Sequence, residues 1–117
     1  MSALLSVHRN PAGFLEGRAQ PGSGRHGEII ASFLQSDIQG DLETARMFLA
    51  ELAAAERGEE PQPGGAGNAF SIAIAPGGAV IRNAVIEGAV AEHYSLAELR
   101  TALETWIAAI ERVRGLR

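Results

Sequence analysis

The chain of 117 residues contains no cysteine and no lysine, and only six of its residues are aromatic. The absence of cysteine excludes disulfide bonds and zinc-thiolate sites, and it favours a cytoplasmic protein over a secreted one. The first residues, MSALLSVHRNPAG, show neither a basic leader nor a long apolar run, so we expect no signal peptide and no membrane span. Because aromatic residues are so few, the core must be built mainly from aliphatic side chains.

The charged residues are ten arginines, twelve glutamates and two aspartates, which give a net charge of −4. Binding to nucleic acid draws its strength from a basic surface that releases counterions, so this balance argues against a nucleic-acid partner. An acidic protein is better matched to a protein partner with a basic surface.

The length predicts a single domain over residues 1–117 with one compact core. Its first part, residues 1–20, holds two short runs of apolar and β-favouring residues, LLSVHR and GFLEGRAQ. The turn-forming NPAG separates these runs, which predicts a β-hairpin.

Residues 27–57 carry apolar side chains at spacings of three to four, which predicts one long helix that is kinked at Gly40. The alternative is that Gly40 ends one helix and Asp41 caps the next. Residues 58–67 combine proline, glycine and charge, so we expect a mobile loop there.

The glycines of the segment GAGNAFSIAIAPGG could in principle bind a phosphate. A phosphate-binding loop follows a strand, opens a helix and usually includes a lysine, whereas these glycines precede a strand in a chain without lysine. Phe70, Ile72 and Ile74 alternate with smaller residues, and the glycine-containing turn leads into AVIRNAV. Residues 68–86 are therefore predicted to form a second hairpin, with glycine serving the turns.

The last element is predicted over residues 95–114, because Ser95 and Glu98 have the spacing of a capping box at the start of an apolar helical stripe. The two hairpins can join into a four-stranded antiparallel sheet with the long helix and the C-terminal helix on one face. The predicted fold class is thus α+β, a two-layer sandwich. The side chains expected to share its core are Phe33, Leu34, Phe48, Phe70, Ile72, Ile74, Leu99, Leu103, Trp106 and Ile110.

The sequence contains few candidates for catalysis or metal binding. His8, His26 and His93 are far apart, and none has a second ligand at helical spacing, so no metal site is predicted. His26 and Glu28 could form an acid/base pair, but no nucleophile motif, carboxylate pair or cofactor fingerprint accompanies them. We therefore expect no catalytic residue, no cofactor and no enzyme activity.

Two sets of residues are candidates for contact with a protein partner. Acidic side chains gather on the long helix and the loop after it, and apolar side chains occur beside acid between Val85 and Tyr94. The alternatives are a solvated acidic face and a further short strand that covers the sheet. The candidate residues are Asp37, Asp41, Glu43, Glu51, Glu59, Glu60, Val85, Ile86, Glu87 and Tyr94.

The pattern GNAFSIAI, then IRN, then SLAELRTALETWIAAI resembles that of small α+β immunity proteins of bacterial toxin systems, including contact-dependent growth inhibition. It is also similar in layout to the YacL-type small proteins. The resemblance implies a cytoplasmic, non-enzymatic inhibitor that binds and blocks one cognate toxin, often a nuclease with a basic active site. The alternative is a small housekeeping or assembly protein of the same fold. Either is expected to be a monomer or a homodimer.

Overall fold

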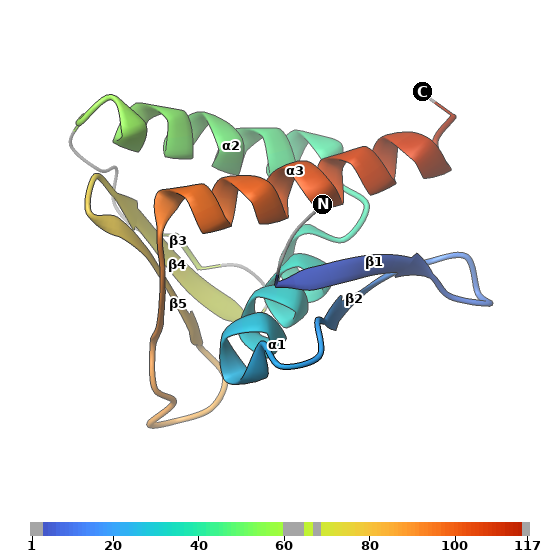
Figure 1. Cartoon of the computed structure of the whole chain (residues 1–117), viewed down its shortest axis with the longest axis horizontal. Helices are drawn as coiled ribbons and strands as arrows, with labels where there is room; N and C mark the ends of the chain where they lie inside the picture. The colour runs from blue at the N-terminus through green and yellow to red at the C-terminus, as the bar shows by residue number, and fades with distance from the viewer. Residues whose placement is uncertain (1–3, 60–64, 67–68, 116–117) are drawn as a thin grey trace.

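The computed structural model describes residues 4–59, 65–66 and 69–115 (Figure 1). Over these residues the chain is α+β, as predicted, with three α-helices, one π-helical segment and two antiparallel sheets. None of the described helices is long and apolar enough to cross a membrane. The predicted loop at 58–67 falls largely outside the described ranges.

The first predicted hairpin is present and consists of β1 (Leu5–Arg9) and β2 (Leu15–Ala19), with Leu5 opposite Ala19. Its turn is closed by the Asn10 side chain, whose Oδ1 accepts a 2.9 Å hydrogen bond from the Phe14 N–H. These two strands form a sheet of their own.

The second predicted hairpin, β4 (Phe70–Ala75) and β5 (Gly78–Asn83), lies in a separate sheet. The two-residue β3 (Gly65–Ala66) pairs with the outer edge of β4, and β6 (Glu92–Tyr94) pairs with β5. The expected alternation along β4 is confirmed, since the side chains of Phe70, Ile72 and Ile74 are buried. The prediction that the two hairpins join into a single four-stranded sheet is wrong.

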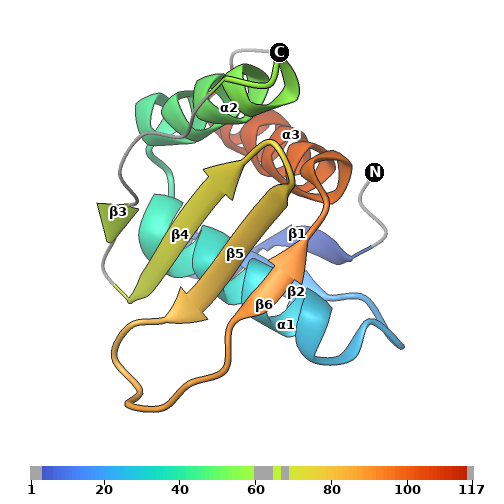
Figure 2. The ribbon, with the colours of Figure 1, turned by 90° about the vertical axis from the view of Figure 1, so that its left-hand side faces the viewer.

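The two sheets cannot join because α1 (Gly24–Phe33) lies between them, with the β4–β6 sheet on one side and the β1–β2 hairpin on the other (Figure 1). Glycine permits the close approach to the hairpin. A Cβ atom at Gly27 would lie 2.6 Å from the carbonyl oxygen of Leu4, and one at Gly17 would lie 3.0 Å from that of Ala31. None of the described helices covers the outer face of the β4–β6 sheet (Figure 2).

The predicted long helix is also wrong, and the alternative of two helices is correct. After α1 comes the π-helical segment η1 (Leu34–Ile38), then a turn, then α2 (Leu42–Glu56). Asp41 is the N-cap of α2, and its side chain accepts hydrogen bonds from the N–H groups of Glu43 and Thr44. The first N–H groups of a new helix have no carbonyl acceptor from a preceding turn, and the Asp41 carboxylate supplies one for two of them. This cap stabilises the start of α2 after the turn at Gln39 and Gly40.

The C-terminal helix α3 (Leu96–Val113) begins with the predicted capping box of Ser95 and Glu98. It packs beside α2, and the two helices lie together across one end of the sheets (Figure 1). The predicted core is confirmed: nine of the ten expected side chains are buried in one cluster, and Phe48 packs against that cluster. Trp106, on α3, is fully buried.

Candidate functional site

The loop of residues 84–91, between β5 and β6, carries three strongly exposed aliphatic side chains. Val85 is 72% exposed, Ile86 60% and Val90 67%. Large aliphatic side chains grouped at a surface mark a site of interaction more often than singly scattered ones do. The two apolar residues that the sequence analysis selected here, Val85 and Ile86, are therefore accessible.

The backbone of this loop is held by hydrogen bonds at both ends. Asn83 Oδ1 accepts from the N–H groups of Val85 and Ile86, at 2.9 and 3.1 Å, and the carbonyl oxygen of Ile86 accepts from the Ala89 N–H at 3.2 Å. At the other end, the Arg25 guanidinium donates a 2.5 Å hydrogen bond to the carbonyl oxygen of Val90. An asparagine that bonds the amides following it is typical of a defined turn. Hydrogen bonds thus hold the backbone of the loop near both of its ends.

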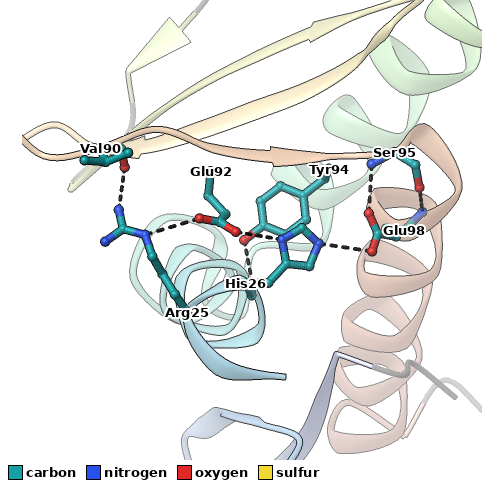
Figure 3. Close-up of polar contacts among 7 residues, drawn as sticks. All are labelled: Arg25, His26, Val90, Glu92, Tyr94, Ser95 and Glu98. Carbon is teal, nitrogen blue, oxygen red and sulfur yellow. Dashed lines mark hydrogen bonds and ion pairs between the residues drawn. The ribbon is translucent and has the colours of Figure 1, made fainter. Parts of the chain in front are cut away.

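A polar cluster lies where the loop returns to the sheet, and it joins α1, β6 and α3 (Figure 3). His26 stands at its centre, with Nδ1 2.8 Å from Glu92 Oε2 and Nε2 3.0 Å from Glu98 Oε2. Arg25 adds an ion pair to the other oxygen of Glu92, at 3.2 Å. The cluster therefore fixes the start of β6 to the beginnings of two helices.

The electrostatics of the cluster favour a charged imidazole. Burial lowers the pKa of His26, but the hydrogen bonds and charges of Glu92 and Glu98 outweigh it, and the pKa is raised above its usual value. The pKa of Glu98 is lowered, first by the Ser95 backbone N–H and also by His26. Each ring nitrogen faces a carboxylate, so the imidazolium can donate to both. A neutral imidazole could donate to only one of the two carboxylates, so we interpret His26 as a structural residue whose charged form the cluster stabilises.

Tyr94 does not lie at the surface, and its predicted role as an interface anchor is corrected. It is 3% exposed, its ring stacks on that of His26 with centroids 4.2 Å apart, and its hydroxyl donates a 2.6 Å hydrogen bond to the carbonyl oxygen of His26. Burial raises the pKa of the Tyr94 hydroxyl. Alternation along β6 decides the matter, because it turns Tyr94 inward and His93 outward.

Two of the acidic residues predicted to contact a partner, Asp37 and Asp41, instead form hydrogen bonds that stabilise the fold. Asp37 accepts hydrogen bonds from the N–H groups of Ala69 and Phe70, at 3.0 and 3.1 Å, and so holds the start of β4. Asp41 caps α2, and its hydrogen bonds with Thr44, through the hydroxyl and the backbone, are the main reason that its pKa is lowered. Their carboxylates are occupied within the chain, which makes them poor candidates for contact with a partner.

The remaining acidic candidates are dispersed. Glu43 and Glu51 are exposed on α2, Glu59 forms an ion pair with Arg57, and Glu87 is exposed in the loop of residues 84–91. Glu60 lies outside the described residues. Figure 2 shows α2 at one end of the molecule and the β5–β6 loop at the other. The structure thus does not bring the acidic helix and the apolar loop together.

The cluster around His26 was not predicted from the sequence. Its carboxylates are 66 and 72 residues away from the histidine along the chain, and of its contacts only the capping role of Glu98 had a local signal. The predicted neighbour, Glu28, is not its partner. Within the described ranges no group of three or more histidine, aspartate and glutamate side chains is placed to hold a metal ion.

Comparison with family models, with curated proteins and with solved structures found no match to this chain. Its function must therefore be inferred from its own geometry.

Proposed function

We propose that this protein binds another protein through the loop of residues 84–91. The observation that carries the proposal is the exposure of Val85, Ile86 and Val90, at 60–72%, on a backbone fixed by Asn83 and Arg25. A loop that is already ordered loses little conformational entropy on binding, so more of the energy of apolar burial remains as affinity. Buried apolar groups at the centre of an interface usually supply most of that affinity.

The more specific proposal is an immunity or antitoxin type of inhibitor that neutralises a cognate toxin by direct binding. Three features support it: the resemblance of the sequence pattern, the net charge of −4, and the exposed acidic side chains of α2. Because α2 and the loop lie at opposite ends, we assign them different roles. The acidic helix attracts a basic partner during approach, and the loop makes the contact that holds it.

The test is an affinity pull-down with quantitative mass spectrometry from the cells that produce the protein. Three baits are compared: the unaltered chain, a variant with Val85→Ser, Ile86→Ser and Val90→Ser, and a control with Met47→Ser. Met47 is an exposed apolar residue on α2, a helix that lies at the other end of the molecule from the loop (Figure 2). We expect one protein to be captured by the unaltered chain and the control and lost with the loop variant. Equal capture by all three baits would refute the loop as the binding site.

Inhibition is tested separately by producing the captured protein in a naive host. We expect it to arrest growth when produced alone and to be tolerated when the unaltered chain is produced with it, while the loop variant fails to protect. If the captured protein is harmless, the binding function stands and the inhibitor function is refuted.

A further inference from the structure

A groove of about 500 Å³ opens between the turn of the β1–β2 hairpin, η1 and the C-terminal end of α3. Its walls are mainly apolar and include Phe14, Leu15, Ile110 and Val113. Phe14 is 71% exposed and Val113 41%, so two of these walls are accessible from solvent. The volume is within the range of small-molecule sites in proteins.

Two amide side chains that line the groove, Asn10 and Gln35, offer donors to a ligand, whereas Gln39 donates its side-chain N–H to the Ser36 carbonyl oxygen and offers an acceptor, Oε1. Asn10 Oδ1 is occupied by the Phe14 N–H at 2.9 Å, and Gln35 Oε1 by the Gly17 N–H at 3.0 Å. Each amide therefore has its NH₂ group left for a ligand. A molecule that fits such a site needs an apolar body and hydrogen-bond acceptors.

The charge of the groove points the same way. Arg114 lines it and donates a 2.6 Å hydrogen bond to the Gly40 carbonyl oxygen, which leaves further N–H groups free to bind an anion. No aspartate or glutamate is among the described residues that line the groove. Asp37 and Asp41 line a neighbouring hollow on which Arg114 also borders, and the charge of Arg114 adds to the Thr44 hydrogen bonds in lowering the pKa of Asp41.

We propose that this groove binds an amphiphilic carboxylate, a small molecule with an alkyl chain and one carboxylate group. The alkyl chain lies along Phe14, Ile110 and Val113, and the carboxylate accepts hydrogen bonds from Arg114 and from the amide nitrogen of Gln35. A charge-assisted bond from a guanidinium is the strongest single contact such a ligand can make. The site is distinct from the loop of residues 84–91, which lies elsewhere on the fold, so this inference goes beyond the proposed function.

The test uses decanoate as the probe and the single tryptophan of the chain as the reporter. Trp106 donates its indole N–H to the carbonyl oxygen of Gln39, and Gln39 lines the groove, so occupancy should change its fluorescence. Decanol and decyltrimethylammonium supply the same chain with a neutral and a cationic head group. We expect saturable binding of decanoate and at least tenfold weaker binding of the other two probes. Absence of saturable binding, or equal affinity for all three probes, would overturn the proposal.

Two variants and one control locate the site. Arg114→Gln should weaken decanoate binding about tenfold, because a hydrogen bond to a charged group is lost. Val113→Asp places a carboxylate on the exposed wall and should abolish binding. Arg112→Gln removes an exposed arginine from the same helix end that does not line the groove, and it should bind as the unaltered chain does. Circular dichroism verifies that each variant is folded, and unchanged binding by folded Arg114→Gln would refute the site.

Discussion

The indole Nε1 of Trp106 donates a 2.7 Å hydrogen bond to the backbone carbonyl oxygen of Gln39. The two residues are 67 positions apart, and the bond joins the middle of α3 to the turn between η1 and α2. Gln39 has φ 54° and ψ −131°, a backbone conformation that residues other than glycine rarely adopt. Such a conformation persists only where contacts with the rest of the fold stabilise it, and the hydrogen bond from Trp106 is one of these contacts.

Trp106→Phe keeps an aromatic ring in the core and removes the N–H donor. We expect it to lower the free energy of unfolding by about 1 kcal/mol, because the Gln39 carbonyl loses its indole partner in a partly buried setting. Trp106→Ala should cost about 3–5 kcal/mol, since it also leaves a cavity. Urea denaturation measures both values, with Met47→Ala as the exposed control. If Trp106→Phe matches the control, the bond does not support the turn.

His26→Gln tests the charged cluster through the pH dependence of stability. The folded pKa of His26 is raised, so its stabilising charge is fully present below the unfolded value of about 6.5 and is lost as the pH rises through the folded pKa. The stability difference between the unaltered chain and His26→Gln should thus be larger at mildly acidic pH than in the alkaline range. It should fall again in strong acid, where Glu98 becomes protonated.

The control for this experiment is His93→Gln, which alters an exposed histidine on the adjacent strand position. Denaturation curves recorded at several pH values should show no such pH-dependent difference for His93→Gln. A difference between the unaltered chain and His26→Gln that is constant across the whole pH range would contradict the ionic description of the cluster.

Asp37→Ala removes the acceptor for two backbone N–H groups at the start of β4. We expect a loss of about 1–3 kcal/mol in stability, because the amides of Ala69 and Phe70 lose their partner. Hydrogen exchange followed by NMR should show faster exchange at these two amides than at the centre of β4. Glu51→Gln, an exposed acidic position on α2, is the control and should change neither quantity. Unaltered exchange at both amides would show that Asp37 is dispensable there.

Charge reversal on α2 tests the separation of roles in the proposed interaction. Glu43→Arg with Glu51→Arg should slow association with the captured partner and reduce its salt dependence, since exposed charges mainly affect encounter. Asp41 is left unaltered because it caps the helix. Val85→Ser with Ile86→Ser should instead speed dissociation. Surface plasmon resonance at two salt concentrations separates the two effects. An unchanged association rate for the α2 variant would show that the acidic side chains of α2 play no part in association.

Local patterns predicted the elements of this fold well. The alternation of Phe70, Ile72 and Ile74 identified a strand with one buried face, and Ser95 with Glu98 identified the start of α3. Both signals arise within a few residues, where spacing alone determines which side chains meet. The apolar spacing across Gly40 was misleading, because buried residues continue at spacings of three to four through Leu34, Ile38 and Leu42 although the helix itself ends before Gly40.

The arrangement of the elements could not be read from such patterns. Whether two hairpins share a sheet depends on what lies between them, and here the small residues Gly17 and Gly27 admit α1 to that position. The candidate site, too, could be predicted only in part. Exposed Val85 and Ile86 followed from a segment without strong periodicity, whereas the burial of Tyr94 depends on contacts with His26, which is 68 residues away.

The position of α1 between the two sheets also determines how the molecule should come apart. A two-stranded hairpin is marginal in water by itself, so β1 and β2 depend on α1 for their stability. The β4–β6 sheet in turn packs β5 and β6 against the same helix, while β4 packs against α2. Neither sheet can detach without uncovering one side of α1, and the described part of the chain should therefore unfold in a single cooperative transition. A fragment that begins after β2 would expose the hairpin side of α1 and should self-associate.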